Sequence, residues 1–214
     1  MRSMWLALAL VCAASAAQAV SLKWDSNGAV GASSQTIFAS GASKTSFSVA
    51  ALITAVNLPS GNAVMMSFGS SSLAVLSYGS ANGIGACFKA SASNANAWSP
   101  NAPASASGQH VVALTFDWSE SNNRWVINFY IDGKNMGFQD KTGYLNKPSG
   151  DLTITFAENA GWTFDDAAIY EGVLTAEELQ TLQESKDMGS VPEPTALALL
   201  AFGAAALALR RRAA

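Results

Sequence analysis

The clearest structural signal in the chain is the stretch 125–133, which reads Trp125-Val126-Ile127-Asn128-Phe129-Tyr130-Ile131-Asp132-Gly133. Through Ile131 the odd-numbered residues are large and apolar, and side chains alternate between the two faces of a strand. An Asp-Gly pair directly after such a run is typical of a tight hairpin turn. The stretch therefore predicts a strand with one face in a core, followed by an antiparallel neighbour.

Strand patterns recur along the chain on both sides of this stretch. They cover 46–56, 64–68, 73–78, 84–88, 110–117 and 152–156, and turn residues separate them at 59–62, 119–123 and 148–150. Charged residues make up only 13% of the chain, and small polar residues are abundant, as in many extracellular β-domains. We predict an all-β fold, an antiparallel β-sandwich, in which 90–108 forms a long surface loop.

One short helix is predicted at the carboxyl end of this domain. The Thr175 hydroxyl can accept from the backbone N–H of Glu178 while the Glu178 carboxylate reaches back, which is a capping box. Leu174 can pack on Leu179, and Leu179 and Leu182 form an apolar stripe for docking on the sandwich.

Residues 1–19 have the pattern of a signal peptide. Arg2 supplies a positive charge, 4–14 form an apolar helical core, and Ala17-Gln18-Ala19 is the small-residue pattern that a signal peptidase cleaves. We expect a signal helix that is removed, so that the mature chain begins near Val20.

Residues 188–214 are expected to form a separate tail after a domain at 20–187. The tail contains Pro192-Glu193-Pro194, an apolar run at 195–209, and Arg210-Arg211-Arg212. A helix over that run is about 22 Å long against a hydrocarbon core of about 30 Å, which makes it a marginal transmembrane span. The arginines favour a cytoplasmic carboxyl terminus and place 20–190 on the far side of the membrane.

This order of proline-glutamate-proline, apolar segment and arginine cluster resembles the PEP-CTERM sorting tail of exported bacterial proteins. The resemblance implies an exosortase-type sorting enzyme as a partner and a transient stay in the inner membrane. It also implies a final place at the cell surface, or in the extracellular matrix, of a Gram-negative-type bacterium. A plain anchor that is never cleaved remains the alternative.

Three sequence segments point to a family for the domain. They are 109–117 (QHVVALTFD), 128–134 (NFYIDGK) and 164–170 (FDDAAIY), the last leading into 172–179 (GVLTAEEL). In order and spacing they resemble the closing half of a LamG-like, concanavalin A-like jelly roll, and 46–53 (SFSVAALI) resembles an early strand of it. The resemblance implies a two-sheet sandwich, glycan or protein recognition, and in some members a calcium ion.

The charge pattern and the carboxylates limit the possible functions. Residues 20–190 carry eight basic and fourteen acidic side chains, and no basic cluster, so we expect no nucleic-acid partner. A glycoside hydrolase needs two facing carboxylates about 5 Å apart, but Glu158 and Glu171 are isolated, and Asp165 and Asp166 are expected to point to opposite faces. The single histidine, His110, is expected to form structural hydrogen bonds. We therefore predict no catalytic residues.

Calcium is the one cofactor that the sequence leaves open. Asp25, Asp165 and Asp166 are the candidate ligands, because the first and last strands of such a sandwich often lie side by side and calcium accepts scattered oxygen ligands. The alternative is that Asp166 accepts hydrogen bonds from backbone groups and Asp25 is solvated.

The sequence favours an exported, non-enzymatic protein that binds carbohydrate or a matrix polymer. Trp98 and Trp162 are the candidate ligand-binding residues, because an exposed indole can stack on the face of a sugar ring. The alternatives are a structural or adhesive surface protein with protein partners and, less favoured, a glycoside hydrolase. The ligand and the oligomeric state are left open.

Overall fold

The computed structural model describes residues 20–58, 63–69, 73–78, 83–90, 95–98, 107–137, 143–146 and 150–191. Residues 22–191 form one compact unit. The expected signal helix at 1–19 and the hydrophobic helix at 195–209 lie outside the described residues. Within those residues no helix is long and apolar enough to cross a membrane.

The first of two β-sheets, here called sheet A, contains seven strands within the described residues. Its order is β1-β13-β3-β8-β9-β10, with β11 also pairing with β9, and the registers of β3, β8, β9, β10, β11 and β13 are antiparallel. The strands are β1 (Ser21–Asp25), β3 (Phe47–Ala55), β8 (Gly108–Ser119), β9 (Arg124–Ile131), β10 (Lys134–Asn135), β11 (Gly143–Asn146) and β13 (Trp162–Glu171).

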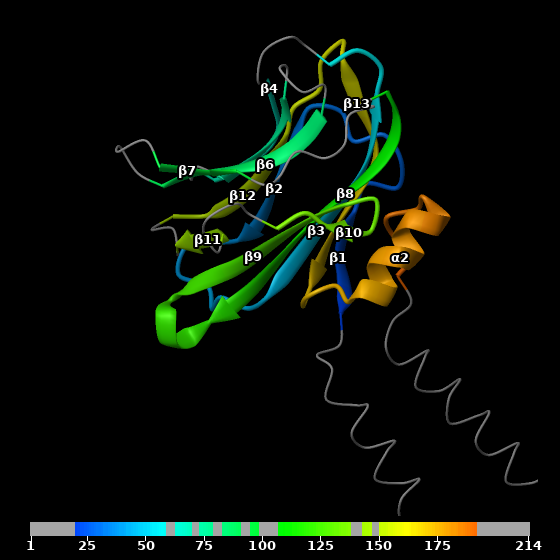
Figure 1. Cartoon of the computed structure of the whole chain (residues 1–214). Coiled ribbons are helices and arrows are strands. Elements are labelled where there is room, and N and C mark those ends of the chain that lie inside the picture. Colours follow the sequence, from blue (N-terminus) through cyan, green and yellow to red (C-terminus); the bar gives the residue numbers. More distant parts are fainter. Residues whose placement is uncertain are drawn as a thin grey trace, which may run out of the picture. The chain divides into compact units, whose positions relative to one another are not determined.

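Sheet B contains six strands within the described residues, in the order β2-β12-β4-β5-β6-β7, and all of its pairs are antiparallel. They are β2 (Ser33–Phe38), β4 (Ala63–Phe68), β5 (Leu73–Tyr78), β6 (Gly83–Ala90), β7 (Ala95–Trp98) and β12 (Leu152–Phe156). Figure 1 shows the two sheets stacked as layers. The predicted antiparallel sandwich is confirmed.

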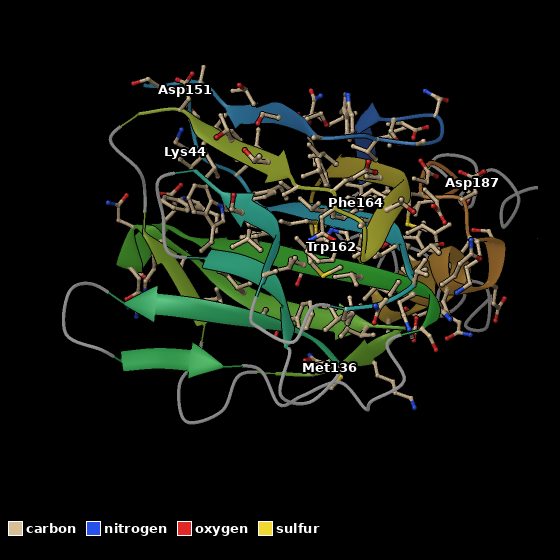
Figure 2. The ribbon with its side chains drawn as sticks, turned by 90° about the horizontal axis from the view of Figure 1, so that it is seen from above. Lys44, Met136, Asp151, Trp162, Phe164 and Asp187 are labelled. Atoms are coloured by element: carbon tan, nitrogen blue, oxygen red, sulfur yellow. The ribbon has the colours of Figure 1, made fainter. Side chains whose placement is uncertain are left out.

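The main hydrophobic core fills the space between the sheets. Strand β9 alternates buried and half-buried residues along its whole length, as the opening stretch predicted. The rings of Phe47 and Phe116 stack with centroids 4.1 Å apart, and the fully buried Trp125 meets Phe47 edge-on at 5.7 Å. Phe164 lies in the same core and is labelled in Figure 2.

Helix α2 (Ala176–Ser185) lies over the outer face of sheet A, beside β8 (Figure 1). Its predicted capping box is present: Glu178 donates its N–H to the Thr175 hydroxyl at 3.2 Å, and Thr175 donates its N–H to the Glu178 carboxylate at 2.7 Å. Leu174, Leu179 and Leu182 are buried outside the main core, so they form a second apolar layer under the helix.

The segment 90–108, expected to be a long loop, is partly a strand. Strand β7 pairs with β6 at the edge of sheet B through positions 95–98. Alanine and asparagine have weak strand preferences, so backbone pairing rather than side-chain pattern defines this strand.

Candidate functional site

Asp166 is held by hydrogen-bond donors on all sides. Its Oδ1 accepts from the Ser26 hydroxyl at 2.7 Å, from its neighbour's N–H (Ala167) at 2.9 Å and from Gly28 N–H at 3.4 Å. Its Oδ2 accepts from the N–H of Met188 at 2.8 Å. Asp166 is only 9% exposed, and its carboxylate joins strand β13 to the segment after β1 and to the segment after α2.

Asp165 lies beside Asp166 but accepts hydrogen bonds from other strands. Its Oδ2 accepts from the hydroxyl of Thr54 and from Gln109 Nε2, the latter at 3.1 Å, and its Oδ1 accepts from Thr163 at 3.0 Å. The carboxylate therefore links β13 to β3 and β8, on the side of Asp166 away from β1.

A β-bulge explains how the two neighbouring carboxylates are arranged. Phe164 pairs with Ile53 and Asp166 with Leu52, so Asp165 is an extra residue in the strand. Phe164 and Ala167 both lie in the core, so the two aspartates between them face away from it. Neighbouring residues point to opposite faces only in a regular strand, and the extra residue interrupts that alternation here. The expectation that Asp165 and Asp166 point to opposite faces is therefore wrong.

The three candidate calcium ligands do not form a metal site. Asp25 and Asp166 do lie on neighbouring strands, as predicted, but Asp165 faces β3, and Asp25 accepts the N–H of Asn27 at 3.0 Å. Among the described residues no group of three His, Cys, Asp or Glu side chains could hold a metal ion. The donors around Asp166 occupy the lone pairs that calcium would need, so these residues do not fit calcium.

The structure places one of the two candidate tryptophans, Trp162, in the core. Trp162 is 1% exposed in the core and donates its Nε1–H to the Ala157 carbonyl at 2.6 Å (labelled in Figure 2). Its assignment as a sugar-stacking residue is therefore wrong, because the ring has no open face. Trp98 ends the edge strand β7, where its backbone pairs with Cys87.

The outer face of sheet B carries a group of hydroxyl side chains, which we call the hydroxyl face: Ser34, Thr36, Ser67, Thr153 and Thr155. On β12 the hydroxyl residues alternate with buried Leu152, Ile154 and Phe156, so they lie on the side away from the core. Thr155 pairs with Ser34 on one side and with Ser67 on the other, and the hydroxyls of Ser34 and Thr155 are 2.7 Å apart.

Backbone register extends one row of this face across the whole sheet. From Thr155 the row runs through Ser67, Ala74 and Cys87 to position 98 on the edge strand. Directly opposed residues of an antiparallel pair belong to the same face of a sheet. The alternation of small polar residues gave only a weak sign of this face in the sequence, because serine and threonine are also common in turns.

His110 and Asp132 form a polar pair on sheet A. His110 Nδ1 lies 2.9 Å from Asp132 Oδ2, and Asp132 Oδ1 accepts the N–H of Val111 at 3.0 Å. Burial would raise the pKa of Asp132, but the hydrogen bonds from His110 and Val111 outweigh it and hold the pKa below 3.8. The pair ties the positive-φ turn at Asp132-Gly133 to strand β8.

The family comparison agrees with this architecture. A family model described as the concanavalin A-like lectin/glucanases superfamily matches residues 25–180, and the chain belongs to this superfamily. A second model, the PEP-CTERM protein-sorting motif, matches 190–212. The motif, which includes Pro192, Glu193, Pro194 and the three arginines, implies recognition by an exosortase-type sorting system. It confirms the predicted export through the inner membrane to the cell surface.

Solved structures show the same fold at low sequence identity. One Trypanosoma rangeli sialidase structure is 17% identical with a TM-score of 0.51 and covers 78% of this chain, and a second is 15% identical with a TM-score of 0.50 and covers 80%. This chain spans 28% of the length of each sialidase. The CBM40 of a Ruminococcus gnavus IT-sialidase is 9% identical, with a TM-score of 0.49, 76% of this chain covered and 100% of the module. No curated protein matches the sequence.

Proposed function

We propose that this protein is a non-enzymatic surface or matrix protein that binds a neutral carbohydrate polymer on the hydroxyl face, with Trp98 as an aromatic platform at its edge. The observation that carries the proposal is the cross-strand row from Ser34 through Thr155 and Ser67 to position 98. Hydroxyl side chains both donate and accept hydrogen bonds, as sugar hydroxyls do.

Charge and position support this choice of surface. The five side chains of the hydroxyl face are uncharged, and Ser34 and Thr36 are exposed. Helix α2, by contrast, covers part of the outer face of sheet A. Because a polyanion would gain no ionic contact from these hydroxyls, a neutral polymer is the better match.

The lack of catalysis is part of the proposal. The fold also occurs in sialidases, so the fold by itself does not separate binding from hydrolysis. The carboxylates of Asp165 and Asp166 are each engaged by several donors that fix the packing of β13. Neither is available as the paired acid and nucleophile of a glycoside hydrolase.

A binding experiment with matched threonine variants tests the proposal. Affinity electrophoresis of residues 20–191 through gels containing neutral or acidic polysaccharides should show retardation by a neutral polymer and no release of reducing ends. Thr155→Val removes one hydroxyl from the hydroxyl face at constant shape and should weaken retardation several-fold. Thr163→Val makes the same change on sheet A and should not. Retardation only by acidic polymers, or by none, would contradict the proposal.

We also propose the processing of both ends: the predicted signal peptide, 1–19, is removed, and a sorting enzyme cleaves the predicted tail, 188–214, beyond the first few tail residues that stay packed on the predicted domain at 20–187. Mass spectrometry of the surface protein checks this. A chain from Val20 to a carboxyl terminus near Pro194 is expected, whereas intact terminal arginines would make the tail a permanent anchor.

A further inference from the structure

The chain stays folded against the domain almost to the start of the sorting motif. After α2, Lys186 takes a left-handed conformation and donates its N–H to Leu182 O at 3.0 Å. Asp187 then organises a turn: its Oδ1 accepts from Gly189 N–H at 2.9 Å, and its carbonyl accepts from Ser190 N–H at 3.2 Å. This turn ends two residues before Pro192.

Met188 fixes this turn to strand β13. Its side chain is fully buried, its N–H donates to Asp166 Oδ2 at 2.8 Å, and its carbonyl accepts from the hydroxyl of Tyr170. Both polar backbone groups of one residue are thus held by two side chains of the same strand. Releasing Met188 leaves buried Asp166 and Tyr170 without this partner, which is costly in a dry environment.

The surroundings of Tyr170 keep its hydroxyl a donor. The side chain is 1% exposed. Burial raises its pKa strongly, and the nearby carboxylates of Asp25, Asp166 and Asp187 raise it further. The hydroxyl therefore remains protonated at any physiological pH, so the contact with Met188 does not depend on pH in that range.

Met188 lies only four residues before Pro192, the first residue of the Pro-Glu-Pro motif. From Met188 to Pro192 the chain reaches at most about 14 Å even when fully extended. A peptide that is recognised as an added strand uses its own N–H and carbonyl groups to pair with the strand edge that binds it. A segment whose N–H and carbonyl groups are already bonded to the domain cannot bind in that way.

We propose that Asp166 and Tyr170 form a latch on Met188 that keeps residues up to Ser190 on the domain and confines the sorting enzyme to the chain from Val191 onward. The latch sets the carboxyl terminus of the processed protein. This role rests on the proposed cleavage of the tail and does not depend on carbohydrate binding; slow exchange of 186–191 with no cleaved product would count against the cleavage and not against the latch contact.

The test uses the full chain and three ways of opening the latch. Tyr170→Phe removes only the hydroxyl, and Asp166→Asn removes one acceptor. Gly189→Ala is a steric route, because a Cβ at this position would overlap the Asp25 carboxylate. Asp165→Asn is the matched control, since this neighbouring aspartate bonds β3 and β8 but not Met188. Asp25→Ala should restore room in the Gly189→Ala background.

The first measurement is hydrogen–deuterium exchange of peptides covering 186–191. Slow exchange is expected in the wild type and in Asp165→Asn, with an increase of about tenfold or more in the latch variants. Peptides from β3 and β8 should exchange as slowly as in the wild type, which shows that the variants remain folded. Fast exchange of 186–191 in the wild type, or no change in both Tyr170→Phe and Gly189→Ala, would overturn the latch.

The second measurement is the mass of the processed protein from cells that contain the sorting enzyme. One carboxyl terminus at or after Val191 is expected for the wild type, with additional upstream cuts in the latch variants and a return to one terminus in the Asp25→Ala, Gly189→Ala double variant. A wild-type terminus before Ser190 would contradict the proposal, as would identical cut sites in all variants.

Discussion

At the scale of single residues, burial can overrule what a side chain suggests in the sequence. Trp162 is a candidate for sugar stacking by its chemistry, yet it is 1% exposed and lies in the same core as Phe164. This burial could not be read from the sequence, because the alternation after Trp162 is interrupted three residues later by the bulge at Asp165. An inserted residue shifts the alternation by one position and leaves no signal of its own in a single sequence.

Trp162→Ala should lower the free energy of unfolding by about 3–5 kcal/mol, because it leaves a cavity and an unpaired Ala157 carbonyl. Urea unfolding of the domain followed by circular dichroism measures this. The adjacent exposed residue provides the control: Thr163→Ala should cost less than about 1 kcal/mol. Equal losses in both variants would contradict the buried position of Trp162.

The Asp132 carboxylate should make the domain sensitive to acid. Its folded pKa lies below its ordinary value of 3.8, so its stabilising contribution is present above that value and is lost as the pH falls through the folded pKa. In urea unfolding at a series of pH values from about 5 to about 2, Asp132→Asn should show a shallower loss of stability than the wild type. Parallel curves for the two proteins would contradict the His110–Asp132 contact.

Metal removal should have little effect. Because donors occupy the carboxylate of Asp166 and Asp165 faces another strand, the melting temperature should change by less than about 1 °C between calcium and a chelator. A calcium-dependent rise of several degrees would show that the domain binds this ion at an unassigned place.

At the scale of elements, local sequence signals predicted the helix and several of the strands. The capping box and the leucine spacing define α2 within a few residues of chain, so they can be read directly. Strands β2, β7 and β11 were missed because they are short or polar and form through backbone pairing with neighbouring strands. Such pairing cannot be read from one segment alone.

Thr175→Ala should cost about 1 kcal/mol, because it removes the acceptor for the Glu178 N–H at the start of α2. Thr181→Ala, in the middle of the same helix, removes an exposed hydroxyl bonded to the Glu177 carbonyl and should cost less. Thermal unfolding of both variants gives the comparison. A larger loss for Thr181→Ala would show that the cap does not stabilise the helix.

At the scale of the whole molecule, the sequence predicted the sandwich and the sorting tail better than the proposed binding site. The sandwich was predicted from the alternation of residues along each strand, and the tail from an ordered set of short motifs. Both kinds of pattern involve residues that are close together in the sequence. The hydroxyl face is assembled from β2, β4 and β12, which are far apart in the chain, and only their register brings Ser34, Thr155 and Ser67 together.

The central claim is that the outer face of sheet B binds a neutral polysaccharide with Trp98 at its edge. The most direct measurement is a titration, by calorimetry, of the polymer that retards the wild-type domain into Trp98→Ala and into Tyr130→Ala, which removes a half-buried aromatic ring from sheet A. Trp98→Ala should weaken binding by at least about tenfold, whereas Tyr130→Ala should bind like the wild type. Equal affinity in the wild type and Trp98→Ala, or a larger loss in Tyr130→Ala, would contradict the account.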